Sequence, residues 1–344
     1  MTKQQHLLVF RFSSLGDVAM TVPVLRLLLK QHPSLRVTMV SAAFVRPLFD
    51  NMERLDFYAA DLKGEHKGLG GLFKLYRACK KLGPFDGIAD LHDVLRTKVL
   101  TGFFFSAGNK IAVIDKVRAE KKELTRKKNK KLQQLPSNFQ RYAAVFATLG
   151  FPVDLIMEEG ITREHAPIEL EELKSNGNNL VGIAPFALHP EKTYPPEKML
   201  EVIRMLSKND KVRILLFGGK KEAPMLDEWS SSIEGVTSLA GKMSFEKELE
   251  WIANLDLMVS MDSANMHLAS MYGVPVVSVW GGTHPYLGFY GWGQDPSNTV
   301  QIDLECRPSS VFGKKHCYND LACMNGISPI MIHEKIIEQL NKGK

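Results

Sequence analysis

Short apolar runs alternate with amphipathic stretches along most of the chain, and this alternation limits the possible folds more than any other feature. In the first half, the strand-like runs His6–Phe12, Arg36–Ser41 and Pro84–Asp90 alternate with the helix-like stretches Val18–Gln31 and Val94–Phe105. Strands separated by helices pair in parallel and use the helices as crossovers. We therefore predict an α/β fold of the doubly wound type.

The alternation is interrupted once, which predicts two domains. Clear periodicity is lost between Phe151 and Asn179, and 344 residues are too many for one simple core. It then resumes with further strand-like runs, which are Leu180–Pro185, Val212–Phe217, Leu257–Met261 and Val274–Trp280. The predicted division is an N-terminal Rossmann-like domain over 1–165, a linker over 166–179, a C-terminal Rossmann-like domain over 180–327 and a closing helix over 328–344.

The composition is that of an ordinary globular protein. Hydrophobic residues make up 44% and charged residues 24% of the chain, which excludes intrinsic disorder for most of it. No apolar run reaches the roughly 18 to 20 residues of a membrane span. The start, MTKQQHLLVFRF, has too short an apolar run for a signal peptide and no small-residue cleavage site, so we expect a cytoplasmic protein.

Positive charge is concentrated in the first half of the chain. Residues 1–172 carry 27 Lys and Arg against 19 Asp and Glu, whereas residues 173–344 carry 17 against 19. The stretch 116–131, KVRAEKKELTRKKNKK, is the most basic and is typical of an exposed loop or a frayed helix. A merely solvated loop is the alternative, but the charge surplus favours attraction to an anionic partner.

A polar loop with a single acidic residue joins the first strand to the first helix. It is Arg11-Phe12-Ser13-Ser14-Leu15-Gly16-Asp17. Ligands bind at the carboxyl ends of strands in such sheets, and the helix dipole keeps a carboxylate in the first turn ionised. Asp17 therefore either faces a ligand or only stabilises the helix start. One glycine is too few for a dinucleotide-binding fingerprint.

Three further polar motifs follow strands of the second half. Asp262 and Ser263 end a strand and cap the next helix, whose first amides suit an anion, with His267 one turn on. Lys192 is a cation suited to a diphosphate. Glu222 follows a glycine pair and suits ribose hydroxyls. Taken singly, each motif has a purely structural alternative, namely a plain helix cap, an exposed loop lysine and a turn. Together with Asp17 they suit a nucleotide-diphosphate donor in one domain and a catalytic base in the other.

The ordered set of motifs resembles glycosyltransferase family 9, the heptosyltransferases of lipopolysaccharide core synthesis. The run from Arg11 to Val18 resembles the opening of these proteins, and the run from Asp262 to Ala269 resembles their second signature. The other matching features are Lys192 with a trailing aromatic residue and Pro195, the turn before Glu222, the run Gly241-Lys242-Met243-Ser244, and Gly273-Val274-Pro275 with Gly281 beyond the next strand.

The resemblance implies a GT-B architecture, in which two Rossmann-like domains face a central cleft. It implies transfer of a heptose from ADP-heptose to a sugar hydroxyl of the inner core, with inversion and without a metal. Asp17 would be the general base, and Lys192 with the amides after Asp262 would stabilise the departing diphosphate. Glu222 would hold the ribose, Met243 would line the adenine pocket and His267 would contact phosphate.

We assign two groups of binding residues besides the catalytic Asp17 and Lys192. The residues assigned to the donor are Ser13, Ser14, Gly16, Glu222, Met243, Asp262, Ser263, Ala264 and His267. The residues assigned to the acceptor are Arg11, Arg96, Lys121, Lys122, Arg126, Lys127 and Lys128. The expected partners are the nucleotide sugar, a lipid-linked core oligosaccharide and the inner face of the cytoplasmic membrane, and no nucleic acid, because no motif for one is present.

The chain departs from the family pattern at two places, which keeps other donors open. Ala264-Asn265 stands where the second signature usually has Gly-Pro, and the loop before Lys192 lacks the small hydroxyl residues of some members. A UDP- or GDP-sugar enzyme and an inactive nucleotide-sugar-binding protein are the alternatives. A structural metal or a disulfide among Cys306, Cys317 and Cys323, with His316, is open too, but their spacing favours plain thiols.

Overall fold

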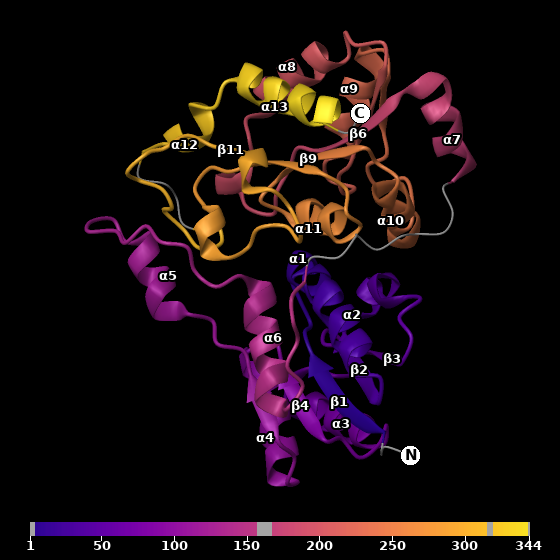
Figure 1. The fold of residues 1–344 in the computed structure, drawn as a ribbon, viewed down its shortest axis with the longest axis vertical. Coiled ribbons are helices and arrows are strands. Elements are labelled where there is room, and N and C mark those ends of the chain that lie inside the picture. The colour runs from indigo at the N-terminus through magenta and orange to yellow at the C-terminus, as the bar shows by residue number, and fades with distance from the viewer. Residues whose placement is uncertain (1–3, 157–166, 315–318, 343–344) are drawn as a thin grey trace. The chain divides into compact units, whose positions relative to one another are not determined.

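A computed structural model describes residues 4–156, 167–314 and 319–342. The chain divides into two compact units, each built on its own parallel sheet (Figure 1). Unit 1 comprises residues 1–117 and 136–156, and unit 2 comprises residues 118–135 and 157–344. Both units alternate strands with helices, which confirms the predicted α/β fold class.

The sheet of unit 1 has the order β3-β2-β1-β4-β5. Its strands are β1 (Gln5–Phe10), β2 (Leu35–Ser41), β3 (Leu55–Ala59), β4 (Gly87–Asp90) and β5 (Ile111–Val113). Strand β1 pairs in parallel with both β2 and β4, so that Leu7 lies opposite Val37 on one side and Gly87 on the other. The strand order reverses beside β1, and ligands of doubly wound sheets bind at such a point.

Helices cover both faces of the unit 1 sheet. They are α1 (Leu15–Ala19), α2 (Thr21–Gln31), α3 (Gly68–Lys80), α4 (Leu95–Ser106) and α6 (Asn138–Leu149), with a 3₁₀ segment at Ala43–Phe49. Helices α3 and α4 pack on the face that carries Leu8 and Phe10. Side chains alternate along a strand, so Leu7 points to the face opposite to Leu8 and Phe10. Leu149 of α6 lies near Leu7 and Gly87 and therefore covers that opposite face.

The sheet of unit 2 has the order β11-β10-β9-β6-β7-β8. Its strands are β6 (Asn179–Ala184), β7 (Val212–Leu216), β8 (Val236–Ser238), β9 (Leu257–Met261), β10 (Val276–Val279) and β11 (Thr299–Val300). Its helices are α5 (Arg118–Thr125), α7 (Ile168–Lys174), α8 (Pro196–Leu206), α9 (Ala223–Ser232), α10 (Phe245–Ala253), α11 (Ala264–Met271), α12 (Ala322–Asn325) and α13 (Pro329–Lys342), with short 3₁₀ segments at Ser175–Gly177, Pro190–Lys192, Pro285–Leu287 and Pro296–Asn298.

Helices α8 and α13 lie side by side in unit 2 (Figure 1). Met199 of α8 and Ile332 of α13 belong to one buried cluster with Val181 and Val259 of the central strands. The closing helix at the end of the chain is therefore part of the core of unit 2. The predicted linker 166–179 also differs from the structure, because α7 lies within it and buries Leu170.

The basic segment 118–135 belongs to unit 2, although the chain enters and leaves it from unit 1. Helix α5 begins this segment and buries Leu124 completely. The ammonium group of Lys121 lies 4.6 Å from the ring centre of Phe289 and is buried. A cation over an aromatic face is favourable, so one side of α5 is a packing surface.

The end of the basic segment is attached to unit 2 through its backbone and one lysine. The backbone N–H of Leu135 donates to the carbonyl oxygen of Tyr286 at 2.9 Å, and Lys130 Nζ donates to the carbonyl oxygen of Pro308 at 3.0 Å. We predicted a loop or frayed helix within an N-terminal domain over 1–165. The segment instead groups with unit 2, where Lys121 packs on Phe289. It begins with the helix α5 and continues from Arg126 as an exposed loop, which agrees with that part of the prediction.

No helix within residues 4–156, 167–314 and 319–342 is both long enough and apolar enough to cross a membrane.

Replacing Leu124 by Ala should release the basic segment from unit 2. Loss of a buried leucine weakens local packing by about 2–5 kcal/mol, and proteolysis follows local opening. We expect trypsin to cleave within residues 118–131 at least about tenfold faster than in the wild type. Leu132→Ala is the matched control, because Leu132 is exposed. Equal cleavage rates for the two variants would contradict this attachment.

Candidate active site

The loop after β1 places Asp17 in the first turn of α1, at the carboxyl edge of the unit 1 sheet. The backbone N–H and the hydroxyl of Ser14 both donate to Asp17 Oδ2, at 3.3 and 2.7 Å. Ser13 and Ser14 are exposed, whereas Gly16 is buried. The side chain of Asp17 is 20% exposed, so it is held by the helix start and still reaches solvent. Both predicted roles of Asp17 are compatible with this position.

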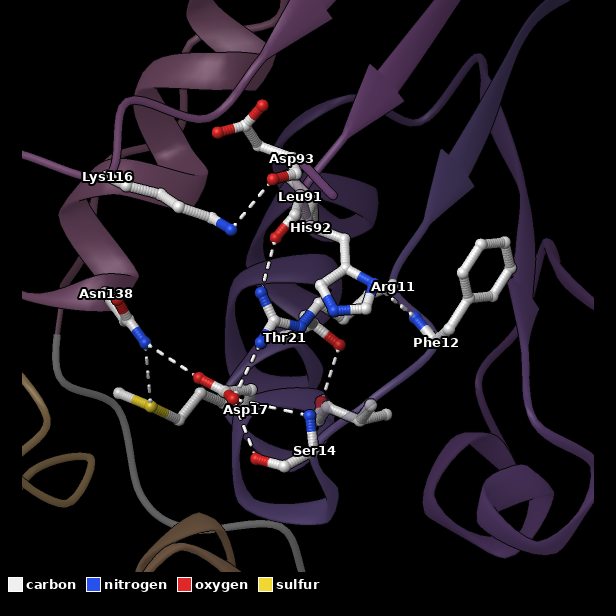
Figure 2. A network of polar contacts seen from close by, with 12 residues as sticks. Arg11, Phe12, Ser14, Asp17, Thr21, Leu91, His92, Asp93, Lys116 and Asn138 are labelled. Atoms are coloured by element: carbon white, nitrogen blue, oxygen red, sulfur yellow. Dashed lines mark hydrogen bonds and ion pairs between the residues drawn. The ribbon is translucent and has the colours of Figure 1, made fainter. Parts of the chain in front are cut away.

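Arg11 turns inward and pairs with Asp17 (Figure 2). Its Nη2 lies 2.6 Å from Asp17 Oδ2, and its Nη1 donates to the carbonyl oxygen of Leu91 at 2.7 Å. The arginine is buried, and its carbonyl oxygen accepts the hydroxyl of Ser41 at 2.6 Å. The guanidinium of Arg11, which we assigned to the acceptor, therefore contacts the Asp17 carboxylate and the loop after β4.

Helix α6 supplies two more contacts to Asp17, which we did not predict from the sequence. Asn138 Nδ2 donates to Asp17 Oδ1 at 3.3 Å, and the hydroxyl of Tyr142 donates to the carbonyl oxygen of Asp17 at 3.2 Å. Ser137 caps α6 by accepting the N–H of Gln140, which fixes the start of the helix beside Asp17. The Ser137-x-x-Gln140 pattern indicates the start of a helix in the sequence, but it does not indicate that this helix lies beside Asp17.

The end of β4 lies beside this cluster and adds His92. The backbone N–H groups of His92 and Asp93 donate to Asp90 Oδ1 at 2.8 and 2.9 Å, which fixes the turn. The backbone N–H of Phe12 donates to His92 Nδ1 at 3.4 Å. Burial, with Arg11 and other cations nearby, lowers the pKa of His92 to about 3. His92 is therefore a neutral imidazole near Asp17 at neutral pH.

The candidate residues of unit 2 meet at one edge because its strands are parallel. Thr283 lies beyond β10, Asp262 follows β9, Lys192 follows β6, Glu222 follows β7 and Met243 follows β8. The spatial order of these strands is β10-β9-β6-β7-β8. The polar loops therefore form a row along the carboxyl edge of the sheet, where an elongated ligand is bound in doubly wound folds.

An ion pair occupies the centre of this row. Lys192 Nζ lies 2.8 Å from Asp262 Oδ2, and the hydroxyl of Thr283 donates to the same oxygen at 2.7 Å. Asp262 is buried, whereas Lys192 is partly exposed. The carboxylate is therefore satisfied internally and holds the lysine at the edge, with its charge toward any anion that binds there. Thr283 was not among the residues that we predicted.

The start of α11 adds backbone donors next to Asp262. Ala264 is its first residue, and Ser263 precedes it as the N-cap residue. We predicted that Ser263 caps this helix, but its side chain makes no capping hydrogen bond. Its hydroxyl oxygen instead lies 3.0 Å from that of Ser260. The first amides of the helix are therefore not bonded by Ser263 and suit an anion. His267 is buried one turn further on.

Glu222 and Met243 lie on two loops that touch each other. The backbone N–H of Gly241 donates to the carbonyl oxygen of Gly218 at 3.2 Å, which joins the loop after β8 to the loop after β7. A Cβ atom at Gly219 would be 2.9 Å from Glu222 Oε2, so the carboxylate folds over the glycine turn. Both side chains are half-buried at the same end of the row.

Arg307 holds the loop that carries Thr283, and nothing in its sequence context indicated this. Its Nε donates to the carbonyl oxygen of Gly281 at 2.6 Å, and its Nη2 donates to that of Thr283 at 3.1 Å. It also donates to the carbonyl oxygen of Ile302 and to Gln301 Oε1, at 2.6 and 2.8 Å. Arg307 is buried, so its four acceptors compensate the loss of water.

The basic residues assigned to the acceptor are divided between the units. Arg96 is exposed in the first turn of α4 in unit 1. Lys121, Lys122, Arg126, Lys127 and Lys128 belong to the basic segment of unit 2. Lys121 is buried on Phe289, and Arg126 pairs with Glu123 at 3.0 Å. A single acceptor-binding set in one domain is therefore not what the structure contains.

The cysteine segment is only partly described. Cys306 and Cys323 are buried, and His316 and Cys317 lie outside the described residues. Within the described residues no three His, Cys, Asp or Glu side chains gather as metal ligands would.

Two doubly wound parallel units with polar loops at the carboxyl edges are the architecture found in the GT-B class of glycosyltransferases. A family model of glycosyltransferase family 9 (heptosyltransferase) matches residues 74–316. The chain belongs to this family, as the sequence motifs predicted, and is therefore a glycosyltransferase.

Individual relatives agree with the family assignment. Lipooligosaccharide heptosyltransferase 2 of Haemophilus influenzae is 24% identical over 314 residues, which cover 81% of this chain and 84% of that protein. The protein of the same name from Campylobacter jejuni is 27% identical over 174 residues. That match covers 48% of this chain and 52% of the relative, so the chain spans about half the length of that protein.

Solved structures share the fold over nearly the whole chain. The glycosyltransferase family 9 protein of Veillonella parvula is 19% identical, with a TM-score of 0.74 and coverage of 99% of each chain. The Escherichia coli heptosyltransferase WaaC, solved with ADP, is 18% identical, with a TM-score of 0.70 and coverage of 97% of this chain and all of that one.

The neutral state of His92 predicts sensitivity to acid. In the unfolded chain a histidine has a pKa of about 6.5, whereas His92 in the folded protein has a pKa of about 3. Between these two pH values the unfolded form binds a proton at this residue and the folded form does not. Stability should therefore fall with pH in this window, by about 2 kcal/mol between pH 7 and pH 5 for this residue. Urea unfolding at the two pH values should show a smaller loss for His92→Gln. Identical losses in both proteins would contradict this origin.

Proposed function

We propose that the chain transfers a heptose from ADP-heptose to a hydroxyl of the lipopolysaccharide inner core, with inversion at the anomeric carbon. Membership of family 9 is the observation that carries this proposal. The names of the relatives support it, because heptosyltransferases of lipooligosaccharide and of the lipopolysaccharide core are among them. The donor, the acceptor and the residue roles below are parts of the same proposal.

Unit 2 binds the donor along its row of carboxyl-edge loops. Lys192 and the first amides of α11 bind the diphosphate, and they stabilise the negative charge that develops on it as the glycosidic bond breaks. Glu222 accepts hydrogen bonds from the ribose, and Met243 contacts the base. His267 lies next to the phosphates. The E. coli WaaC structure with ADP supports this choice of nucleotide.

Unit 1 binds the acceptor, and Asp17 acts as the general base. The acceptor hydroxyl gives its proton to the Asp17 carboxylate while its oxygen forms a bond to the anomeric carbon. The bond to the diphosphate breaks on the opposite face, and ADP leaves with the electron pair. Arg11 and Ser14 fix Asp17 Oδ2, and Asn138 donates to Oδ1.

The remaining residues have secondary parts in this proposal. Ser13, Ser14 and Gly16 shape the loop that carries Asp17, next to the transferred sugar. Arg96 meets an anionic group of the acceptor, and Lys122, Lys127 and Lys128 attract its phosphates or carboxylates from the basic segment. We propose no metal in the reaction. The acceptor is lipid-linked, so the protein works at the cytoplasmic face of the inner membrane.

Asp17→Asn should abolish transfer while leaving donor binding intact. An amide keeps the size of the side chain but cannot take the proton, so kcat should fall by about 10²- to 10⁴-fold with little change in the KM for ADP-heptose. ADP release and product formation with an inner-core acceptor measure this. Asp56→Asn is the control, because Asp56 is a carboxylate on β3 with an exposed side chain, and it should keep the wild-type rate.

Two results would contradict the proposal at different levels. If Asp17→Asn turns over at the wild-type rate, Asp17 is not the base, although the proposed reaction is still possible. Absence of ADP release by the wild-type protein, with donor and acceptor both present, removes heptose transfer from ADP-heptose itself.

A further inference from the structure

Three large apolar side chains project from helices α3 and α4 of unit 1 into solvent. Leu69 is 71% exposed, Leu95 is 78% exposed and Phe105 is 72% exposed. Single exposed apolar residues are common in globular proteins, but several on adjoining helices mark a surface that a partner covers.

The two helices form one continuous layer. They pack side by side, and the ring of Phe103 on α4 lies 5.5 Å from that of Phe73 and 5.4 Å from that of Tyr76 on α3. Their inner residues, Leu72 and Leu100 among them, belong to the core beneath. The exposed residues reach solvent from the same two helices. We call this surface, with Leu69, Phe73, Leu95 and Phe105, the α3–α4 face.

The charged residues of helices α3 and α4 are all basic. Helix α3 contains Lys74, Arg77 and Lys80, helix α4 contains Arg96 and Lys98, and neither helix contains Asp or Glu. Lys98 also pairs with Asp93 at the start of α4, at 3.3 Å. Lys74, Arg77, Lys80 and Arg96 are exposed on the same two helices as the apolar side chains, which favours an anionic partner.

We propose that the α3–α4 face docks the protein on an anionic phospholipid bilayer. Helices that lie in the interfacial plane insert aromatic and aliphatic side chains among the acyl chains, while their Lys and Arg meet the lipid phosphates. Leu69, Leu95 and Phe105 supply the first kind of contact, and the exposed Lys74 and Arg77 supply the second.

The basic segment of unit 2 is less suited to this role. One side of α5 is used to pack Leu124 and Lys121. Glu123 also neutralises two of the cations, because it pairs with Arg126 and Lys131 at 3.0 Å each. The segment therefore combines cations with a carboxylate, whereas the α3–α4 face combines cations with apolar side chains, as insertion requires.

The reason for docking rests on the proposed function, since a lipid-linked acceptor is reached from the membrane surface, but the observations stand without it. The test is sedimentation of the full chain with vesicles of phosphatidylcholine alone or with about 30 mol% phosphatidylglycerol. We expect binding to the anionic vesicles only, weakened when salt rises from about 0.1 M to about 0.5 M.

Two double variants separate the apolar and the charged contributions. Leu69→Gln with Phe105→Gln, and Lys74→Glu with Arg77→Glu, should each weaken binding to anionic vesicles at least about tenfold. These four side chains are exposed, so ADP affinity and thermal unfolding should be unchanged. Ile168→Gln is the matched control, because Ile168 is 72% exposed on α7 of unit 2, and it should bind like the wild type.

Three outcomes overturn the docking surface. In the first, the wild-type protein does not bind anionic vesicles. In the second, both α3–α4 double variants bind them as well as the wild type. In the third, Lys127→Glu with Lys128→Glu loses binding while the α3–α4 variants keep it. Failure of heptose transfer is a separate result. Transfer to a water-soluble, delipidated acceptor should be equal in wild type and Leu69→Gln with Phe105→Gln, while only vesicle binding differs.

Discussion

Parallel pairing of the strands is the constraint on which the rest of this structure depends. β1 pairs in parallel with β2 and β4, and β9 pairs in parallel with β6 and β10. Each strand must then be followed by a crossover, so all strands of a unit end at the same edge. Residues as distant in sequence as Lys192 and Asp262 meet there at 2.8 Å. The candidate site is thus a consequence of backbone hydrogen bonding, and side-chain chemistry is added at the loops.

Each unit uses an ion pair to hold its principal side chain at that edge. In unit 1, the buried Arg11 fixes Asp17, and in unit 2, the buried Asp262 fixes Lys192. In both pairs the partner is the more buried one and has further hydrogen bonds, to the Leu91 carbonyl oxygen or from Thr283. A buried charge that is held by several polar contacts is rigid, so the exposed member is held in place before a ligand arrives.

The sequence predicted the regular elements and the family well, because these depend on local pattern. The strand Leu257–Met261 agrees with β9 in both bounds. Strand β3 and helix α3 were missed, since β3 has little buried surface and α3 begins with three glycines in four residues. The orientation of Arg11 and the packing of the basic segment on unit 2 could not be predicted, because both depend on neighbours that are distant in sequence.

We propose that the carboxyl edge of unit 2 binds an adenosine diphosphate group, and a comparison of nucleotide affinities is the direct test. Isothermal titration of the full chain with ADP, UDP, GDP and CDP, in the absence of added metal, compares the four. We expect ADP to bind at least about tenfold more tightly than the others, and Lys192→Ala to weaken ADP binding by about 1–3 kcal/mol. Tighter binding of UDP or GDP, or ADP affinity unchanged in Lys192→Ala, would contradict it.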